Sequence, residues 1–195
     1  TIELADLLPA TRYYYQISSS DSPIPASDPD QYFQTPPLTG TPAPTRIWVT
    51  GNTDITTPEK QKVKEAFLNF TGDTPTDVWL GLGDQGSTDF HYRDALFNSF
   101  PEVLKNTPFW PTLGNRDAMG FAYKLVFDLP THGEAGGYPS GNESYYSFDH
   151  GNIHFICLNS NQNPESMADW IKEDLRSTRA DWIIAYFHHA PYTLG

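Results

Sequence analysis

The sequence predicts an α/β fold, a sheet layered with helices, and two patterns support that prediction. Segments typical of strands alternate with segments typical of amphipathic helices over most of the chain. Polar residues also follow several of those strands directly, as they do in open α/β sheets, which bind ligands at strand ends. The chain has 195 residues, 38% of them hydrophobic, so it is long and apolar enough to bury a core.

Residues 1–36 are predicted to form β-structure ahead of the main domain. Residues 1–4 and the tyrosine-rich run 12–17 have the partial alternation of strands. Two or three strands cannot bury a core alone. We therefore expect them to pack on the rest of the chain, or to pair with a partner chain or a second copy. Four prolines then predict a stiff linker at 37–45, which leaves 46–195 as the main domain.

Beyond the linker, strands and helices are predicted in alternation. Strands are expected at 47–49, 78–82, 145–148, 153–158 and 182–187. Helices are expected from residue 57, at about 90–105 and at about 166–177. The first of them begins with a capping residue, Thr57, and a proline at its first position. Its predicted apolar face consists of Val63, Ala66, Phe67 and Phe70.

The charge of the chain excludes several classes of partner. The formal net charge is −12, and non-specific binding to nucleic acid or to an anionic membrane needs a basic surface. The same charge repels a phosphate ester at long range, so a site for one needs local positive charge from metal ions or from an arginine. The sequence has a single cysteine, Cys157, which excludes an intrachain disulfide. Cys157 lies in an apolar run and is predicted to be a buried strand thiol.

Two sequons favour a secreted protein. Asn-x-Ser/Thr sequons begin at Asn69 and Asn142, each beside glycine in turn-like surroundings that accommodate a glycan. No stretch approaches the roughly 20 apolar residues of a membrane span. Thr1 does not begin a signal peptide, which is the expectation for a mature or cleaved chain.

Asp, Asn and His residues collect directly after the predicted strands. The segments are Gly51-Asn52-Thr53-Asp54, Gly83-Asp84-Gln85, Gly114-Asn115-Arg116-Asp117, Asn159-Ser160-Asn161 and His188-His189. Oxygen and imidazole donors that converge on one rim suit a metal such as Zn, Mn or Fe. Taken one at a time, the Gly-Asn and Gly-Asp pairs are equally typical of ordinary turns.

Several of these segments together resemble a known family. Leu82-Gly83-Asp84, the run 103–115, the run 145–155 and His188-His189 are similar, in this order, to motifs of the purple acid phosphatases, within the calcineurin-like metallophosphoesterases. The resemblance covers 46–195, and the region around Tyr13 is similar to the last strands of the fibronectin-III-like domain that precedes the catalytic domain in that family. It implies a layered β-sandwich flanked by helices.

The resemblance also implies a site and a reaction. The family holds two metals, bridged by an Asp, that activate a hydroxide to hydrolyse phosphate monoesters. Asp84 matches the bridging carboxylate, Asn115 the amide ligand of the second metal, and His188 the first of its paired histidines. His189 is expected to be a supporting residue next to that site. The cofactor implied is a pair of Fe, Zn or Mn ions.

This sequence departs from the family pattern at the first metal position. Asn52 stands where the family has a metal-binding Asp, and Asp54 reaches that position only if the loop rearranges. After Asp84 the chain reads Gln85-Gly86-Ser87, without the family's tyrosine, so a purple chromophore is not expected.

Further departures affect the rest of the site. Arg116 replaces the family's His, and an arginine cannot act as an acid, although it can hold phosphate through a bidentate fork. Asn159 stands where the family usually has Asp. The sequence given ends at Gly195, ahead of the family's Gly-His-x-His segment, so the domain is expected to be truncated there.

Two functions of different classes follow from this pattern. The first is hydrolysis of phosphate monoesters, by a site completed by residues outside this chain. The alternative is a catalytically inactive, secreted phosphatase-fold glycoprotein with a binding or structural role. The metal content of the purified protein separates them.

Overall fold

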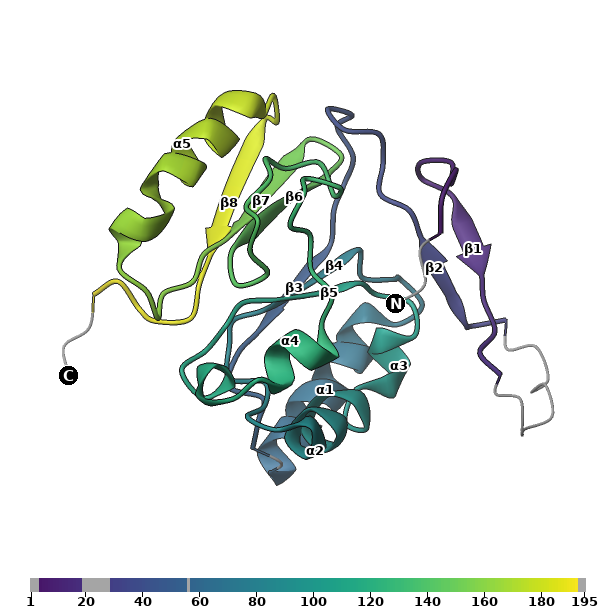
Figure 1. Ribbon diagram of the computed structural model, residues 1–195. Coiled ribbons are helices and arrows are strands. Elements are labelled where there is room, and N and C mark those ends of the chain that lie inside the picture. The colour runs from purple at the N-terminus through teal and green to yellow at the C-terminus, as the bar shows by residue number, and fades with distance from the viewer. Residues whose placement is uncertain (1–3, 19–28, 56, 193–195) are drawn as a thin grey trace.

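The protein is built around two three-stranded sheets, shown in Figure 1 as a computed structural model that describes residues 4–18, 29–55 and 57–192. The first sheet is parallel and has the order β3 (Ile47–Thr50), β4 (Val78–Gly81), β5 (Phe109–Pro111). In the second, β6 (Tyr146–His150) runs antiparallel to β7 (Ile153–Cys157), which pairs in parallel with β8 (Trp182–Tyr186). This arrangement confirms the predicted mixed α/β fold.

The helices gather on either side of the sheets. Figure 1 shows α1 to α4 beside the first sheet and α5 along the outer side of the second. The helices are α1 (Pro58–Thr71), α2 (Asp89–Tyr92), α3 (Pro101–Leu104), α4 (Ala122–Val126) and α5 (Ala168–Ser177). Single turns of 3-10 helix occur at Asp117–Met119 and Pro164–Met167.

Aromatic side chains fill the space between the two sheets. Trp110 of β5 stacks on Phe148 of β6 with 3.8 Å between ring centroids, and Phe148 stacks in turn on Phe155 of β7. The phenol of Tyr146 donates a hydrogen bond of 2.7 Å to the carbonyl of Pro111 and so satisfies its polar end. Cys157 is buried and free, as predicted. This core fixes the relative position of the two sheets.

The segment 90–105 does not form the single helix that its apolar stripe predicts. It is divided into α2, a π-helical turn at Arg93–Phe97, and α3. Pro101 stands at the first turn of α3, and because proline has no N–H to donate, a continuous helix cannot pass through it. Most of the stripe is nevertheless buried, with Leu96 and Phe100 packed under Trp79.

Helix α1 begins at the predicted cap but buries a different face. Thr57 accepts a hydrogen bond from the N–H of Lys60, as expected of an N-cap. Of the predicted face, Phe67 stacks on Trp48, whereas Val63 and Phe70 are exposed. The buried face also includes Lys64, whose ammonium reaches Glu102 of α3, because lysine can cover apolar surface with its methylene chain while its charged end finds a polar partner.

The N-terminal segment forms a separate two-stranded sheet. Strand β1 (Arg12–Tyr14) pairs antiparallel with β2 (Tyr32–Gln34), so the predicted strand 12–17 ends early. Of the predicted strand at 1–4, residues 1–3 lie outside the described part of the chain. Tyr15 anchors this sheet to the main body through a hydrogen bond of 2.8 Å to the carbonyl of Lys105. The division into domains stays a prediction.

Candidate functional site

The carboxyl ends of the first sheet and of β8 meet at one rim, where three of the predicted site residues come together. The Nε2 atom of His188 lies 3.0 Å from Oδ1 of Asn115 and 3.7 Å from Oδ1 of Asp84. These residues are far apart in the sequence and follow β4, β5 and β8. The rim therefore brings a carboxylate, an amide and an imidazole to one point; their role as metal ligands stays a prediction.

Two glycines make this close approach of the loops possible. A methyl group on Gly114 would lie 2.2 Å from the backbone nitrogen of Asp84, and one on Gly83 would lie 2.6 Å from the ring of His188. Gly83 also has a φ of +81°, a region that favours glycine. Any larger residue at either position would therefore push the candidate ligands apart.

Asp117 holds the loops after β4 and β5 in register. Its buried carboxylate accepts hydrogen bonds of 2.6 to 3.2 Å from five donors, namely the N–H groups of Asp84, Gln85, Gly86 and Gly114 and the phenol of Tyr92. Burial raises the pKa of Asp117 against the lowering effect of these bonds. Asp117 was not among the predicted site residues, although its place after Gly114-Asn115-Arg116 was the available signal.

The ring of His188 is oriented by the backbone. Its Nδ1 lies 2.7 Å from the carbonyl oxygen of Leu82, which can only accept, so we infer that the proton sits on Nδ1. Nε2 faces Oδ1 of Asn115 and Oδ1 of Asp84, and because neither oxygen donates, Nε2 meets them either through a proton of its own or through a shared cation. A histidine that donates one ring N–H to a carbonyl and offers the other nitrogen is the usual form of a metal ligand.

Arg116 links the loops after β3 and β4. Its Nη1 donates a hydrogen bond to Oδ2 of Asp54, and its Nε lies 3.7 Å from Oδ2 of Asp84. The backbone N–H of Arg116 also donates to Oδ1 of Asp84, at 2.9 Å. The hydrogen bond to Asp54 raises the pKa of Arg116, so the guanidinium is a permanent charge. The phosphate contact predicted for Arg116 therefore has to compete with Asp54.

The other predicted residues border the rim. Asn52 is exposed and donates its backbone N–H to the carbonyl of Gly83, in a left-handed conformation with a φ of 54°. The ring of His189 lies 2.8 Å from the hydroxyl of Ser160. Asn159 is buried and accepts a hydrogen bond from the N–H of Asn161. His189 thus contacts the neighbouring loop.

The two implied metal positions differ in how well their residues fit a metal. Asp84, Asn115 and His188 offer three lone-pair donors to one point, which suits a single ion. On the other side, the Arg116 guanidinium already stands against Asp54 and Asp84, and Asn52 brings no charge. In the described part of the chain, no three His, Cys, Asp or Glu side chains form a group able to hold a metal. The pair of metals does not fit.

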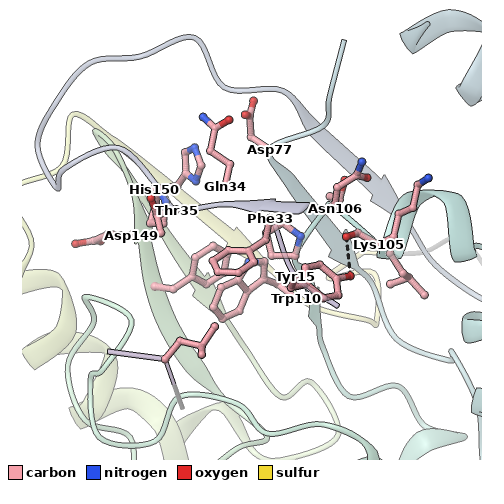
Figure 2. Close-up of a pocket in the computed structure, with 16 residues that line it drawn as sticks. Tyr15, Phe33, Gln34, Thr35, Asp77, Lys105, Asn106, Trp110, Asp149 and His150 are labelled. Atoms are coloured by element: carbon pink, nitrogen blue, oxygen red, sulfur yellow. Dashed lines mark hydrogen bonds between the residues drawn. The ribbon is translucent and has the colours of Figure 1, made fainter. Parts of the chain in front are cut away.

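A separate cavity lies at the opposite ends of the strands. It has a volume of about 500 Å³ and is bounded by the N-terminal sheet on one side and by the segments that precede β4 and β5 on the other. Figure 2 shows Tyr15, Phe33 and Trp110 in its wall, with the hydrogen bond from Tyr15 to Lys105 at one side. Because it lies away from the rim, it does not belong to the candidate site.

Comparison with known proteins identifies the family of the chain. It is 30% identical to purple acid phosphatase 23 of Arabidopsis thaliana, in an alignment that covers 93% of this chain and 46% of the relative. It is 26% identical to purple acid phosphatase 21 of the same plant, over 98% of this chain and 44% of the relative. The chain belongs to the purple acid phosphatase family. No protein-family model matches it.

Solved structures agree with this family in fold. Purple acid phosphatase PPD1 from yellow lupin seeds has a TM-score of 0.65 at 15% identity, over 81% of this chain and 32% of that one. GAP50, described as the anchor in the inner membrane complex of Plasmodium, has a TM-score of 0.53 at 19% identity, over 77% of this chain and 56% of that one. The chain spans a little under half the length of its curated purple acid phosphatase relatives.

No helix in the described residues has the length and apolar character needed to cross a membrane.

Proposed function

We propose that this chain is a purple acid phosphatase-type domain that has lost the hydrolysis of phosphate monoesters and has a binding or structural role. The observation that supports this most directly is the pairing of Arg116 with Asp54 and Asp84. It neutralises carboxylates that metals would otherwise need, and it places a residue that cannot donate a proton at the position of the family's acid. Asn52 removes a further charge from the same side.

The local charge also weakens binding of the substrate. Around the Arg116 guanidinium stand the carboxylates of Asp54 and Asp84, with buried Asp117 behind them. A phosphate dianion that approaches this rim must displace Asp54 from the guanidinium and is repelled by the remaining acids. Without metal ions, phosphate binding is expected to be weak.

The test is hydrolysis of p-nitrophenyl phosphate by the purified chain, with Fe, Zn and Mn ions supplied in turn and metal content measured in parallel. We expect turnover near background. The double variant Asn52→Asp with Arg116→His restores a ligand and an acid, and should gain activity only if ligands from outside this chain complete the site. Robust turnover by the unmodified chain, with two bound metals, would overturn the proposal.

A second candidate is slow hydrolysis of phosphate monoesters with one bound metal. The orientation of His188 favours it, because the ring donates from Nδ1 to the backbone and its Nε2 lies beside the oxygens of Asn115 and Asp84, where one ion could be shared. Under this reading, activity depends on added Mn²⁺ or Zn²⁺ and is lost in His188→Ala. His189→Ala is the matched control, because His189 contacts Ser160 and should leave that activity in place.

Secretion and glycosylation are part of the same proposal. Asn69 is exposed but lies in the last turns of α1, so the turn-like surroundings predicted for it are wrong, whereas Oδ1 of Asn142 accepts two hydrogen bonds from Ser144. We expect a glycan at Asn69 when the protein is made in a eukaryotic secretory host. Mass spectrometry of the wild type against Asn69→Gln tests this, with Asn142→Gln as the comparison.

Association through the N-terminal sheet remains a proposal as well. Tyr14 and Ile17 are exposed beside a sheet of two strands, which leaves apolar surface near a strand edge. Light scattering of the purified chain measures its mass in solution. A well-behaved monomer at high concentration argues against self-association through this segment.

A further inference from the structure

Arg116 stands where the rim has a concentration of negative charge. Its guanidinium contacts Asp54 and Asp84, and its backbone N–H donates to Asp84. The two aspartate side chains are 9% and 5% exposed, whereas the arginine side chain is 45% exposed. Two nearly buried carboxylates from different loops thus share one cation that reaches them from the solvent side.

A second observation shows that this cation does not satisfy the site completely. Oδ1 of Asp54 is buried and has no hydrogen-bond partner among the described residues, and the same holds for the neighbouring hydroxyl of Thr53. A buried carboxylate oxygen without a partner is costly, and buried polar atoms normally have one. The unsatisfied oxygen belongs to the same side chain that binds Arg116. The ammonium of Lys60 also lies near, since Asp54 raises the pKa of Lys60 against the lowering effect of burial, but it donates to the carbonyl of Thr53 and leaves Oδ1 of Asp54 without a hydrogen bond.

We propose that the Arg116 guanidinium takes the place of a metal ion between Asp54 and Asp84, and that its removal turns this side of the rim into a site for one divalent cation. An arginine suits this role because its planar fork is always charged and binds carboxylates directionally. It carries one positive charge where a divalent metal would carry two, and its fork leaves Oδ1 of Asp54 without a partner. The inference deepens the proposed function and rests on it.

The proposal makes a gain-of-binding prediction. In Arg116→Ala, the carboxylates of Asp54 and Asp84 lose their shared cation and face each other across the vacated space. Two nearly buried carboxylates without their shared cation favour uptake of a hard cation with oxygen ligands, such as Mn²⁺. The variant should therefore bind one Mn²⁺ per chain more than the wild type, or bind it at least about tenfold more tightly, a coupling of about 1.4 kcal/mol.

Isothermal titration with Mn²⁺ alone, checked by metal analysis after dialysis, measures this difference. Arg116→Gln tests the same prediction with a side chain closer to the original volume, in case Arg116→Ala does not fold. Arg116→Lys keeps the charge and should show no gain. Arg93→Ala is the matched control, because it removes an exposed arginine paired with Asp94 and should also show no gain.

A third comparison identifies the ligand. Adding Asp54→Asn to Arg116→Ala should abolish the gained Mn²⁺ binding. Asp54 is a ligand of the proposed cation site only, whereas Asp84 is shared with the position formed by Asn115 and His188. Equal Mn²⁺ binding by the wild type and by both neutral variants, with circular dichroism showing them folded, overturns the inference. Hydrolysis by the wild type alone overturns the proposed function instead, so the two failures are distinguishable.

Discussion

The protein places a cation between two aspartates twice, once in the core and once at the rim. In the core, the ring of His154 lies 2.7 Å from Oδ1 of Asp149 and 2.8 Å from Oδ2 of Asp174. At the rim, Arg116 contacts Asp54 and Asp84. The two cations differ in their exposure to solvent, since the side chain of His154 is fully buried and that of Arg116 is 45% exposed.

The surroundings decide what each cation contributes. His154 of β7 joins Asp149 of β6 to Asp174 of α5, so it ties the outer helix to its sheet. Burial opposes a charge on the ring, but the hydrogen bonds to the two aspartates outweigh it and raise the pKa of His154 to about 9. Arg116 instead joins loops at the ends of strands. The core pair therefore holds the fold, whereas the rim pair occupies the candidate site.

The largest effect is expected from Asp174→Ala. Asp174 accepts hydrogen bonds from Ser147 and from the N–H of Tyr138 in addition to its contact with His154. Its removal leaves a buried charge with one partner fewer, which typically costs about 3–5 kcal/mol of the free energy of unfolding. Urea denaturation measures this. Asp169→Ala, on the exposed face of the same helix, should leave the midpoint unchanged. Equal effects of the two substitutions would show that the buried pair of His154 and Asp174 does not stabilise the fold.

The second-largest effect is expected from Asp117→Asn, because Asp117 holds together the loops that form the rim. In the wild type, five donors share the two accepting oxygens of the Asp117 carboxylate. The amide of asparagine has only one accepting oxygen, so several of these donors lose their partner. We expect a loss of about 2–3 kcal/mol. Hydrogen exchange should also become faster at the N–H groups of Gly86 and Gly114. Protection unchanged at both, as in the surface control Asp94→Asn, would remove Asp117 from this role.

A smaller effect is the dependence of stability on pH. Because the pKa of His154 is raised from its ordinary 6.5 to about 9 in the folded state, the folded protein binds more protons than the unfolded chain between these values. The stabilisation is fully present below pH 6.5 and is lost as the pH rises through about 9. Thermal unfolding from pH 6 to 9.5 should show this decline, and His154→Gln should flatten it. A wild-type curve that rises over this range contradicts the assignment of charge.

The smallest effect is expected from Arg116→Lys at the rim. The guanidinium is largely exposed, and ion pairs of this kind contribute little to stability because solvent screens them. We expect the smallest shift of the thermal midpoint among these variants, together with a marked dependence on salt. A shift as large as that of Asp174→Ala would show that the rim pair holds the fold as well.

Most strands, and the helices α1 and α5, could be predicted from the sequence, and so could the rim. Asp84 follows the predicted strand 78–82, and strands that run parallel end at one edge of their sheet. Strand β5, which precedes Asn115, was not predicted from periodicity, and the family motif placed Asn115 at the site instead. The motifs that contain Asp84 and Asn115 also predicted the purple acid phosphatase family, and the curated relatives confirm that prediction. These inferences are local or rest on topology, and need no knowledge of side-chain direction.

Tertiary structure decided the contacts made by each charged side chain. Periodicity placed apolar residues on α1 but did not show that Lys64 would be buried and Val63 exposed, because the orientation of a helix depends on the surface beneath it. The sequence also left open whether Arg116 points to solvent, to phosphate or to Asp54. A long side chain has many rotamers of similar energy, and only a carboxylate brought from another loop selects one of them.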